Sequence, residues 1–408
     1  MRAAELNGDA RPVGGPIFTA GFNALLAIVG ACGLVIVWRL FRGLGAVSAM
    51  NDGYPWGIWI AYDVVSGTAL ACGGYAVALL CYVLNKGQYH SLVRPAVLTS
   101  ALGYSLAGFA VLLDLGRYWN IWKAPFLLNW NRNSILLEVA LCISAYTVVL
   151  WIEISPAFIE RWRDSTSPLL RGIAERLTPF LNRTLLWFMA LGILLPTMHH
   201  SSLGALMLIG VSKLHQLWFT PLLPLMFVVS CIAMGYAVVV FEATVSARLF
   251  KRPHEHKMLT SLSGVMVGVL TTLVGMRLVD LISRQRIGLA FTPDRYALFF
   301  WLEMAAFITP AILLAPKDWR RDPGIQFLSA LMMMVAGTLY RFDVFLVGFN
   351  PGPQFSYFPS AFETLVTLGL IAVEVAAYLA IVKRFPILSG APVAAGPPGL
   401  VSGLRAAS

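Results

Sequence analysis

The sequence predicts an all-α, polytopic integral membrane protein with about ten transmembrane helices packed as helical bundles. The 408-residue chain is 58% hydrophobic and 12% charged, and its mean hydropathy is +0.74. A soluble domain carries about 25% charged residues, so a soluble multidomain protein and a disordered chain are both excluded. Apolar segments of about twenty residues recur along the chain, which is the length that spans a hydrocarbon core of about 30 Å. The predicted spans are 17–38, 57–84, 92–113, 134–155, 180–201, 219–246, 259–283, 296–315, 325–349 and 360–383.

The first and last segments bound a single membrane domain, predicted over residues 17–385. The polar start, residues 1–16, leads into an apolar segment too long for the h-region of a signal peptide, so we interpret 17–38 as the first span. Residues 386–408 are rich in Pro, Gly and Ala, which predicts a disordered tail. No convincing internal repeat is visible.

The loop charges predict the orientation. With the N-terminus on one side, nineteen Lys and Arg residues fall on that side and nine on the other, while Arg277 and Arg341 lie within spans. The positive-inside rule then places both termini in the cytoplasm of a bacterial inner membrane. The opposite face, here called the far side, is predicted to be periplasmic. The net charge of +10 therefore needs no nucleic-acid partner.

Two far-side loops are longer than turns. Residues 114–133 contain Trp119, Trp122 and Trp130 among basic residues, and tryptophan favours the membrane interface. The loop is therefore either an interfacial anchor or a platform for a partner protein. Residues 203–218 are expected to form a short half-buried helix ending near His215 and Trp218.

Grouped metal ligands are missing from the sequence pattern. The five cysteines fall inside apolar segments with no CxxC pair, so we interpret them as ordinary helix residues and expect no metal site. Haem b in a helix bundle needs two axial ligands, usually histidines on facing helices. Only His199 and His200 lie at membrane depth, and adjacent residues point about 100° apart on a helix. We therefore expect neither haem nor an iron–sulfur cluster in this chain.

Ionisable side chains at membrane depth are the main functional signal, because each costs on the order of 2.5–3.5 kcal/mol to insert. Most lie toward the far side, and a sparser set, Glu153, Glu242 and Glu374, lies toward the cytoplasm. The far-side group comprises Asp63, Asp114, Arg117, Glu138, His199, His200, Arg277, Asp280, Glu303, Arg341 and Asp343.

A carboxylate and an imidazole at similar depth suit proton-coupled quinone chemistry. Reducing a quinone to a quinol takes two electrons and two protons, and Glu and His can both hydrogen-bond the carbonyl oxygens and deliver protons. Structural alternatives stay open. In the structural interpretation, Arg277 and Asp280, spaced i, i+3, neutralise each other on one helix face, and Glu138 is a solvated helix-end residue. Arg341 and Asp343 are each expected to pair with another helix.

The residues also resemble a known family. The stretch from Asn51 to Phe109, followed by DLGRYWN, is similar to the integral membrane subunits of the polysulfide reductase/nitrite reductase (NrfD) type. Within these, it looks most like the subunit, often named cytochrome b, of periplasm-facing NiFe hydrogenases of the hydrogenase 2 kind. NSILLEVALC, LLPTMHHSSLG and FNPGPQFSYFP match further on, and the resemblance covers about residues 15–388.

The resemblance implies a metal-free subunit that reduces menaquinone or ubiquinone near the periplasm. It implies a periplasmic ferredoxin-like iron–sulfur partner, fed by the large and small subunits of a NiFe hydrogenase. Glu138 and His199 match the family positions for quinone protonation. Around them we expect a quinone pocket, with proton-path candidates on other spans. The expected pocket residues are Asp63, Asp114, Arg117, Trp119 and His200, and the expected path residues are Arg277, Asp280, Arg341, Asp343, Glu242 and Glu374, with Glu153 as a further candidate.

The sequence departs from the family pattern at one position, and three alternative functions stay open. The family pattern has Gln where this chain has His200, which leaves open which histidine faces the quinone. A close rival keeps the quinone site but pairs it with a molybdopterin oxidoreductase for polysulfide, nitrite or another oxyanion. A secondary transporter would show broken helices and inverted repeats, and Pro196, Pro224 and Pro310 lie near or within spans without a repeat. A purely structural anchor would tolerate neutralising Glu138 and His199.

Overall fold

The computed structural model describes residues 10–124, 126 and 130–390, and it places ten helical segments of membrane-spanning length and composition in this part of the chain. This confirms the predicted all-α membrane fold. The spanning helices are α1 (Ala20–Arg42), α4 (Val93–Asp114), α5 (Ile135–Arg163), α6 (Pro168–Leu206), α7 (Leu223–Leu249), α8 (His256–Ser283), α9 (Arg295–Leu314), α10 (Pro323–Phe342) and α11 (Ala361–Arg384), together with a broken second span over Trp59–Val83.

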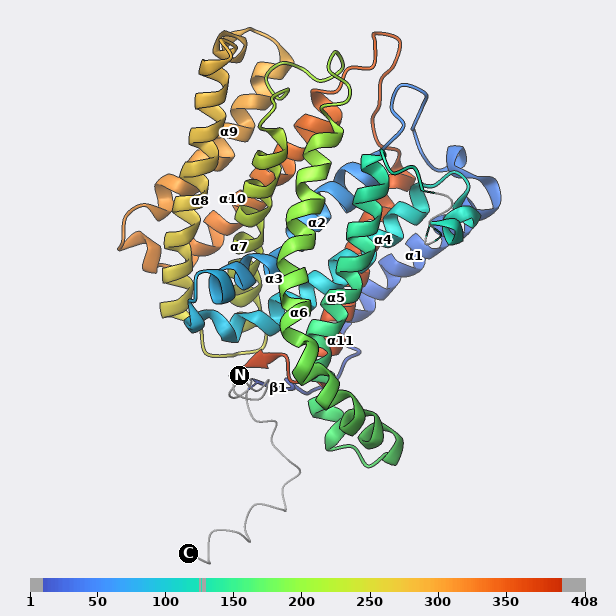
Figure 1. Ribbon diagram of the computed structural model, residues 1–408, viewed down its shortest axis with the longest axis vertical. Helices are drawn as coiled ribbons and strands as arrows, with labels where there is room; N and C mark the ends of the chain where they lie inside the picture. Colours follow the sequence, from blue (N-terminus) through green and yellow to red (C-terminus); the bar gives the residue numbers. More distant parts are fainter. Residues whose placement is uncertain (1–9, 125, 127–129, 391–408) are drawn as a thin grey trace, which may run out of the picture.

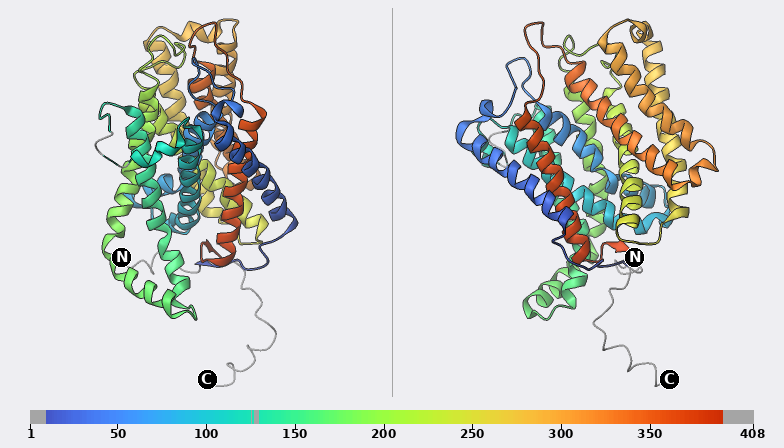
Figure 2. Two further views of the ribbon diagram at one scale, coloured as in Figure 1. Left: turned by 90° about the vertical axis from the view of Figure 1, so that its right-hand side faces the viewer. Right: turned by 180° about the vertical axis from the view of Figure 1, so that it is seen from behind.

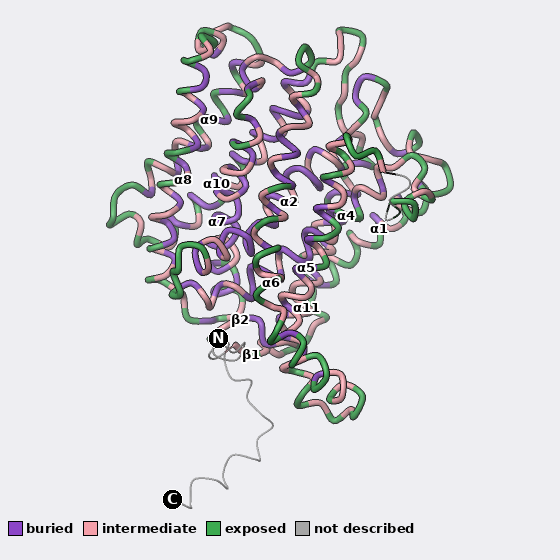
Figure 3. Tube along the Cα trace, in the orientation of Figure 1, coloured by how far each residue is buried: buried purple, intermediate pink, exposed green. Residues whose placement is uncertain are grey.

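The helices form two groups joined through a central layer (Figures 1 and 2). One group contains α8, α9 and α10, and the other contains α1, α4, α5 and α11, with α6, α7 and the second span between them. The second span and α7 are the most enclosed, with 78% and 72% of their apolar windows buried, against 17% for α1. Burial is accordingly concentrated along the centre of the molecule (Figure 3). The outer helices present apolar side chains such as Leu34, Leu186 and Val279 outward, as lipid contact requires.

The second span changes helix type twice and is interrupted once, at Ala71 and Cys72. It consists of a π-helical segment η2 (Trp59–Ser66), the short helices α2 (Gly67–Leu70) and α3 (Gly73–Ala78), and a second π-helical turn η3 (Leu79–Val83). Two side-chain hydroxyls add hydrogen bonds to backbone carbonyls of this span. Ser66 Oγ donates to the carbonyl of Ala61 at 2.9 Å, and Thr68 Oγ1 donates to the carbonyl of Val64 at 2.5 Å. Such π-helical bulges recur at functional sites.

The α5–α6 hairpin extends beyond the expected spans of 134–155 and 180–201. At 1.5 Å per residue, the 39-residue α6 is about 58 Å long, nearly twice the hydrocarbon thickness. Ile159, Ala174 and Leu181 pack together near its tip, and the hairpin projects from one end of the molecule (Figure 1). The hydropathy pattern ended these spans too early because the arginines that follow leave the membrane without breaking a helix.

The two ends of the membrane domain meet on the same face as this hairpin (Figure 1). Strand β1 (Ala10–Arg11) pairs antiparallel with β2 (Leu388–Ser389). The predicted disordered tail therefore began a few residues too early, at 386, because its first residues complete this pair. Residues 391–408 and 1–9 lie outside the described residues.

The far-side loops carry short 3₁₀ segments: η1 (Leu44–Ala46), η5 (Tyr118–Lys123) and η7 (Ile287–Phe291). On the other face lie η4 (Gly87–Leu92) and η8 (Trp319–Arg321), and η9 (Asp343–Val347) is a π-helical continuation of α10. The predicted helix over 203–218 is wrong. Helix α6 continues to Leu206, and the rest forms turns anchored by a bridge from Leu214 to Phe349.

Candidate functional site

Two buried histidines near the far-side end of α6 face the broken second span. The Nε2 atom of His199 lies 3.1 Å from Thr68 Oγ1. The Nε2 atom of His200 lies 3.1 Å from Cys72 Sγ and 3.4 Å from the hydroxyl of Tyr104 on α4. Both side chains are essentially inaccessible, and their Nδ1 atoms have no hydrogen-bond partner among the described residues. The two Nδ1 atoms are therefore the unused polar groups of this region.

Glu138 lies one helical turn farther toward the far side. It occupies the first turn of α5, after the N-cap Ser134, and its side chain is exposed. Its Oε1 accepts a hydrogen bond of 2.7 Å from Ser202, which is three residues after His199 on α6. The structure thus places an accessible carboxylate against α6, one helical turn along that helix from the buried His199. Ser202 was missed, although its i+3 spacing from His199 was visible in the sequence.

Asp63 lies on η2 at the far-side end of an elongated cavity. Its Oδ2 accepts a hydrogen bond of 2.7 Å from Thr367 on α11. The cavity has a volume of about 380 Å³, and its walls come from the second span, α4, α7, α10 and α11. Gly67, the neighbour of Thr68, lines it too, and its rim includes the exposed Val245 and Val375, so the cavity opens toward lipid.

Two further carboxylates line the same cavity closer to the other face. Glu242 on α7 accepts hydrogen bonds from Thr99 Oγ1 at 3.0 Å and from the hydroxyl of Tyr378 at 2.5 Å. Glu374 on α11 lines the cavity against Gly103, where an added Cβ would lie 3.3 Å from its Oε1. Three carboxylates therefore line one cavity whose other walls are mostly apolar.

Glu153 belongs to a separate, smaller cavity of about 70 Å³. It lies on α5 and packs against Gly192 of α6, where an added Cβ would clash with its Oε1. His90 and Arg94 line the same cavity near the face that carries the chain ends. Glu153 thus lies in a different cavity from Glu242 and Glu374.

Arg277 does not pair with Asp280, so the alternative in which these two charges neutralise each other is wrong. Arg277 instead forms a buried ion pair with Glu303 of α9, with 3.4 Å between Nε and Oε1, and Trp218 Nε1 donates to Glu303 Oε2 at 2.8 Å. Asp280 pairs with Arg284 one turn later, at 2.6 Å. The long arginine fork reaches a neighbouring helix, whereas the short aspartate is satisfied close to its own backbone.

Arg341 and Asp343 are fully buried, and neither forms an ion pair with another of the residues that the structure describes. The Arg341 guanidinium donates to the carbonyls of Val65 at 2.9 Å and Gly337 at 3.1 Å, and it lies 5.2 Å from the ring centroid of Phe227. Within the described part of the chain no carboxylate pairs with it, so the expected ion pair to another helix is replaced by carbonyl contacts. Both carboxylate oxygens of Asp343 lack a hydrogen-bond donor in the same set of residues.

Asp114, Arg117 and Trp119 lie at the far-side end of α4 and in η5, away from the histidines. Arg117 and Trp119 are exposed, and Asp114 is partly buried. Among the described residues none of the three hydrogen-bonds to Glu138, His199 or His200. Arg39 of α1 anchors this corner by donating to the carbonyls of Leu113 and Leu115. These residues therefore lie on the far-side surface, and they do not line the cavity of about 380 Å³.

Sequence reasoning also missed a buried carboxylate that organises the far-side loops. Glu363 closes a capping box with Ser360 at the start of α11 and accepts hydrogen bonds from the Ala49 amide at 2.9 Å and the Tyr357 hydroxyl at 2.8 Å. The S-x-x-E spacing before an apolar run was a readable signal for it. It ties the loop before the second span to the loop before the last one.

Comparison with known protein families gives a match over most of the chain. Residues 46–351 match the family described as "Polysulphide reductase, NrfD". The chain belongs to the NrfD family. This confirms the resemblance seen in the sequence and agrees with a polytopic membrane subunit.

Three relatives from this comparison differ in the complexes that they name. The Escherichia coli (strain K12) "Probable Ni/Fe-hydrogenase 2 b-type cytochrome subunit" is 39% identical, over 93% of this chain and 95% of that protein. The Nitratidesulfovibrio vulgaris (Hildenborough) "Menaquinone reductase, integral membrane subunit" is 27% identical, over 76% of each chain. A selenate reductase subunit from Mesobacillus selenatarsenatis is 24% identical, over 90% of this chain and 93% of that protein.

The name of the Escherichia coli relative includes the words "b-type cytochrome", so the histidines were compared with those of a haem b site. Haem b in a helix bundle needs two axial ligands, usually histidines on facing helices. The only histidines inside spans toward the far side, His199 and His200, are adjacent, with ring centroids 4.6 Å apart. His215 is stacked on Tyr296, with 4.2 Å between centroids, and lies outside the spans. No facing pair therefore exists among these residues.

Proposed function

We propose that this chain is the membrane anchor and quinone-reducing subunit of a respiratory NiFe hydrogenase in the bacterial inner membrane. It would take electrons from a periplasmic ferredoxin-like iron–sulfur subunit and pass them to menaquinone or ubiquinone. The observation that carries the proposal is the hydrogen bond from Ser202 to the exposed Glu138, which places this carboxylate one helical turn along α6 from the buried His199. The similarity to the hydrogenase 2 subunit over nearly the whole chain supports the choice of partner.

The lipid-open cavity is the proposed quinone site. Its apolar walls suit an isoprenoid tail, and Asp63 at its far-side end can hydrogen-bond a quinone oxygen. Thr68 neighbours the lining residue Gly67 and contacts His199 at 3.1 Å. A proton taken up at exposed Glu138, which Ser202 positions, would reach the quinone through His199, whose Nε2 faces Thr68 beside the cavity.

Each residue then has a distinct role. Glu138 exchanges protons with the far-side aqueous phase, because it is the exposed member of the group. His199 passes a proton at its imidazole, and its position is held by the Thr68 hydroxyl. Arg117 and Trp119 remain accessible on the same face and are proposed to contact the iron–sulfur partner.

We further propose that the carboxylates closer to the chain ends form a cytoplasmic proton branch. Glu242 and Glu374 line the same cavity as Asp63, which supports a single path from the quinone toward that face. Glu153 occupies its own cavity and would be a second entrance. A group of charged residues lies beside α9 and α10 and would stabilise charge that moves through this half of the protein. It consists of the ion pairs Arg277–Glu303 and Arg284–Asp280 and the buried residues Arg341 and Asp343.

The proposal is tested with the assembled complex in its native membrane. Hydrogen-driven reduction of a menaquinone analogue is compared with hydrogen-driven reduction of a viologen dye, which needs the catalytic subunits alone. His199→Gln should lower quinone reduction at least tenfold and leave dye reduction unchanged, and Asp52→Asn, an exposed far-side carboxylate, serves as the control. Equal quinone reduction by wild type and His199→Gln would refute the role of His199.

One alternative partner is favoured by a specific observation. The relative named for a selenate reductase indicates that this family also serves other oxidoreductases. Purification of the tagged chain in mild detergent, followed by mass spectrometry of the bound proteins, separates the two. A hydrogenase large and small subunit with a ferredoxin-like protein supports the proposal. A molybdopterin subunit keeps the quinone site and replaces the hydrogenase, whereas an intact preparation without a redox partner favours a transporter.

A further inference from the structure

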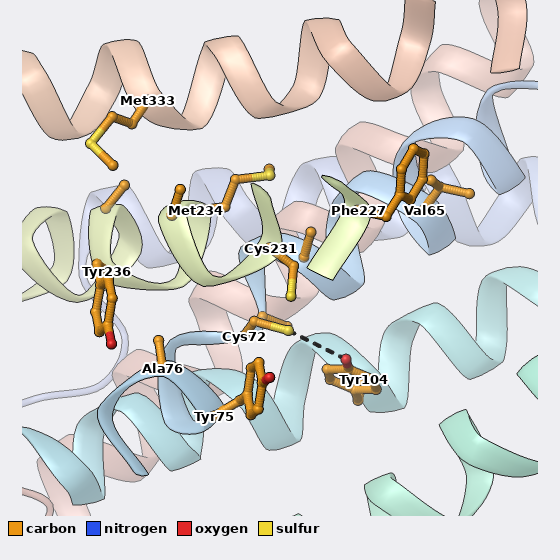
Figure 4. Packing of buried hydrophobic residues seen from close by; sticks show 14 of the residues in the cluster. Val65, Cys72, Tyr75, Ala76, Tyr104, Phe227, Cys231, Met234, Tyr236 and Met333 are labelled. Carbon is orange, nitrogen blue, oxygen red and sulfur yellow. Dashed lines mark hydrogen bonds between the residues drawn. The ribbon is translucent and has the colours of Figure 1, made fainter. Parts of the chain in front are cut away.

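Two cysteines and one histidine from three different helices meet in the core of the protein. They are Cys72 at the break between α2 and α3, His200 on α6 and Cys231 on α7, and all three are buried. Their ligand atoms, two Sγ atoms and Nε2, all lie within 4.8 Å of one another, and Cys72 Sγ is 3.1 Å from His200 Nε2. Figure 4 shows the thiols of Cys72 and Cys231 pointing toward each other.

The backbone is built for this approach. Cys72 follows Ala71 in the non-helical break of the second span, so its side chain is not constrained to the lipid-facing or core-facing stripe of a continuous helix. On α7, an added Cβ at Gly235 would lie 2.5 Å from the Cys72 carbonyl oxygen. Only glycine therefore lets α7 come this close to the break, which brings Cys231 opposite Cys72.

We propose that Cys72, Cys231 and His200 form a binding site for one soft d¹⁰ metal ion, Cu(I) or Zn(II). Thiolate and imidazole are the donors that these ions prefer. An ion bonded to two sulfurs and one imidazole nitrogen holds its ligand atoms about 3.5–4 Å apart, a spacing that the present arrangement reaches with small side-chain movements. The Tyr104 hydroxyl, 3.5 Å from Cys72 Sγ, lies beside the metal position.

Charge favours Cu(I) over Zn(II). Phe227, Cys231 and Met234 share one face of α7, and Arg341 contacts both Phe227 and Met234, with 3.1 Å between its Nη1 and Met234 Sδ. Its positive charge thus lies against the same helix face as Cys231, and no carboxylate of the described residues neutralises it. Binding Cu(I) releases the two thiol protons and forms a complex of charge −1, which balances Arg341, whereas Zn(II) forms a neutral complex and leaves that charge unbalanced.

The site is separate from the proposed quinone chemistry. It uses the Nε2 atom of His200, the histidine that replaces the glutamine of the family pattern, and it leaves His199 with its own hydroxyl partner. The inference rests on the three ligands and their geometry, so it stands or falls independently of the hydrogenase assignment.

The test measures metal in the full-length protein. The chain is purified in detergent under anaerobic, reducing conditions, loaded with Cu(I) from a bicinchoninate complex or with Zn(II), passed through a desalting column and analysed by plasma mass spectrometry. Wild type should retain about one copper ion per chain. Cys72→Ala and Cys231→Ala should each retain at least tenfold less, and Cys142→Ala, which replaces a buried cysteine outside the cluster, should match wild type.

X-ray absorption of the loaded wild-type protein supplies a second measurement that needs no variant. Two sulfur ligands and one imidazole in the first coordination shell support the proposed site. Retention of zinc with the same dependence on Cys72 and Cys231 supports the site and overturns the preference for copper. Metal retained equally by the two variants, no retained metal in wild type, or a Cys72–Cys231 disulfide found by peptide mass spectrometry in anaerobically prepared protein would overturn the proposal.

Discussion

Replacing Glu138 with glutamine isolates proton delivery from the geometry of the far-side site. Glutamine keeps an oxygen that can accept the 2.7 Å hydrogen bond from Ser202, so the packing of α5 against α6 should persist. Removing a positioned proton donor costs 10²–10⁴-fold in rate. Because Glu138 is exposed, water can replace it in part, so we expect a loss of about 10²-fold, equivalent to about 2.7 kcal/mol in activation free energy.

The assay is hydrogen-driven quinone reduction per assembled complex. Glu138→Gln should lower the rate, while viologen reduction stays at the wild-type level. Ser202→Ala removes only the positioning hydrogen bond, worth about 1 kcal/mol, and should lower the rate about fivefold. A rate of quinone reduction for Glu138→Gln within threefold of wild type would refute the reasoning.

Three further predictions concern stability, measured as apparent unfolding in detergent. Glu303→Gln should destabilise the protein by about 3–5 kcal/mol, because it leaves the Arg277 guanidinium buried beside a neutral amide; an effect below 1 kcal/mol would contradict this. Gly235→Ala should cost about 1–3 kcal/mol through the clash with the second span, whereas Gly268→Ala, with open space around its Cβ position, should be neutral or stabilising. Burial lowers the pKa of His215, with a nearby carboxylate opposing it, so the native state binds fewer protons than the unfolded chain and stability should fall as the pH drops below about 6.5. His215→Phe keeps the ring stacking and should lose less stability than wild type between pH 7.5 and 5.5, and an equal loss would argue against this origin.

Hydropathy located the membrane spans but not the full length or the breaks of every helix. The sequence predicted all ten segments because apolar length is matched to bilayer thickness and does not depend on neighbouring helices. It misplaced the near-side ends of α5 and α6, since hydropathy detects the membrane boundary and these helices continue past it. The breaks in the second span were also invisible, because a π-helical turn leaves no periodic signature in a fully apolar stretch.

The candidate site was predictable in depth but not in its contacts. Topology placed Glu138 and His199 in the same leaflet, and in the structure Glu138 accepts a hydrogen bond from Ser202, three residues after His199 on α6. Which charged residues form ion pairs with each other could not be predicted from the sequence. The i, i+3 spacing suggested that Arg277 pairs with Asp280, yet interhelical packing brings Glu303 closer to the guanidinium.

The sequence by itself determined the class of protein, the number of spans, the family and the leaflet that holds most of the ionisable groups, because these follow from composition, segment length and motif order. Only the tertiary structure decided which groups meet. Cys72, His200 and Cys231 are remote in the sequence and belong to helices without distinguishing patterns. Their convergence depends on a helix break and a single glycine contact, and such interhelical distances of a few ångströms are set by packing rather than by local sequence.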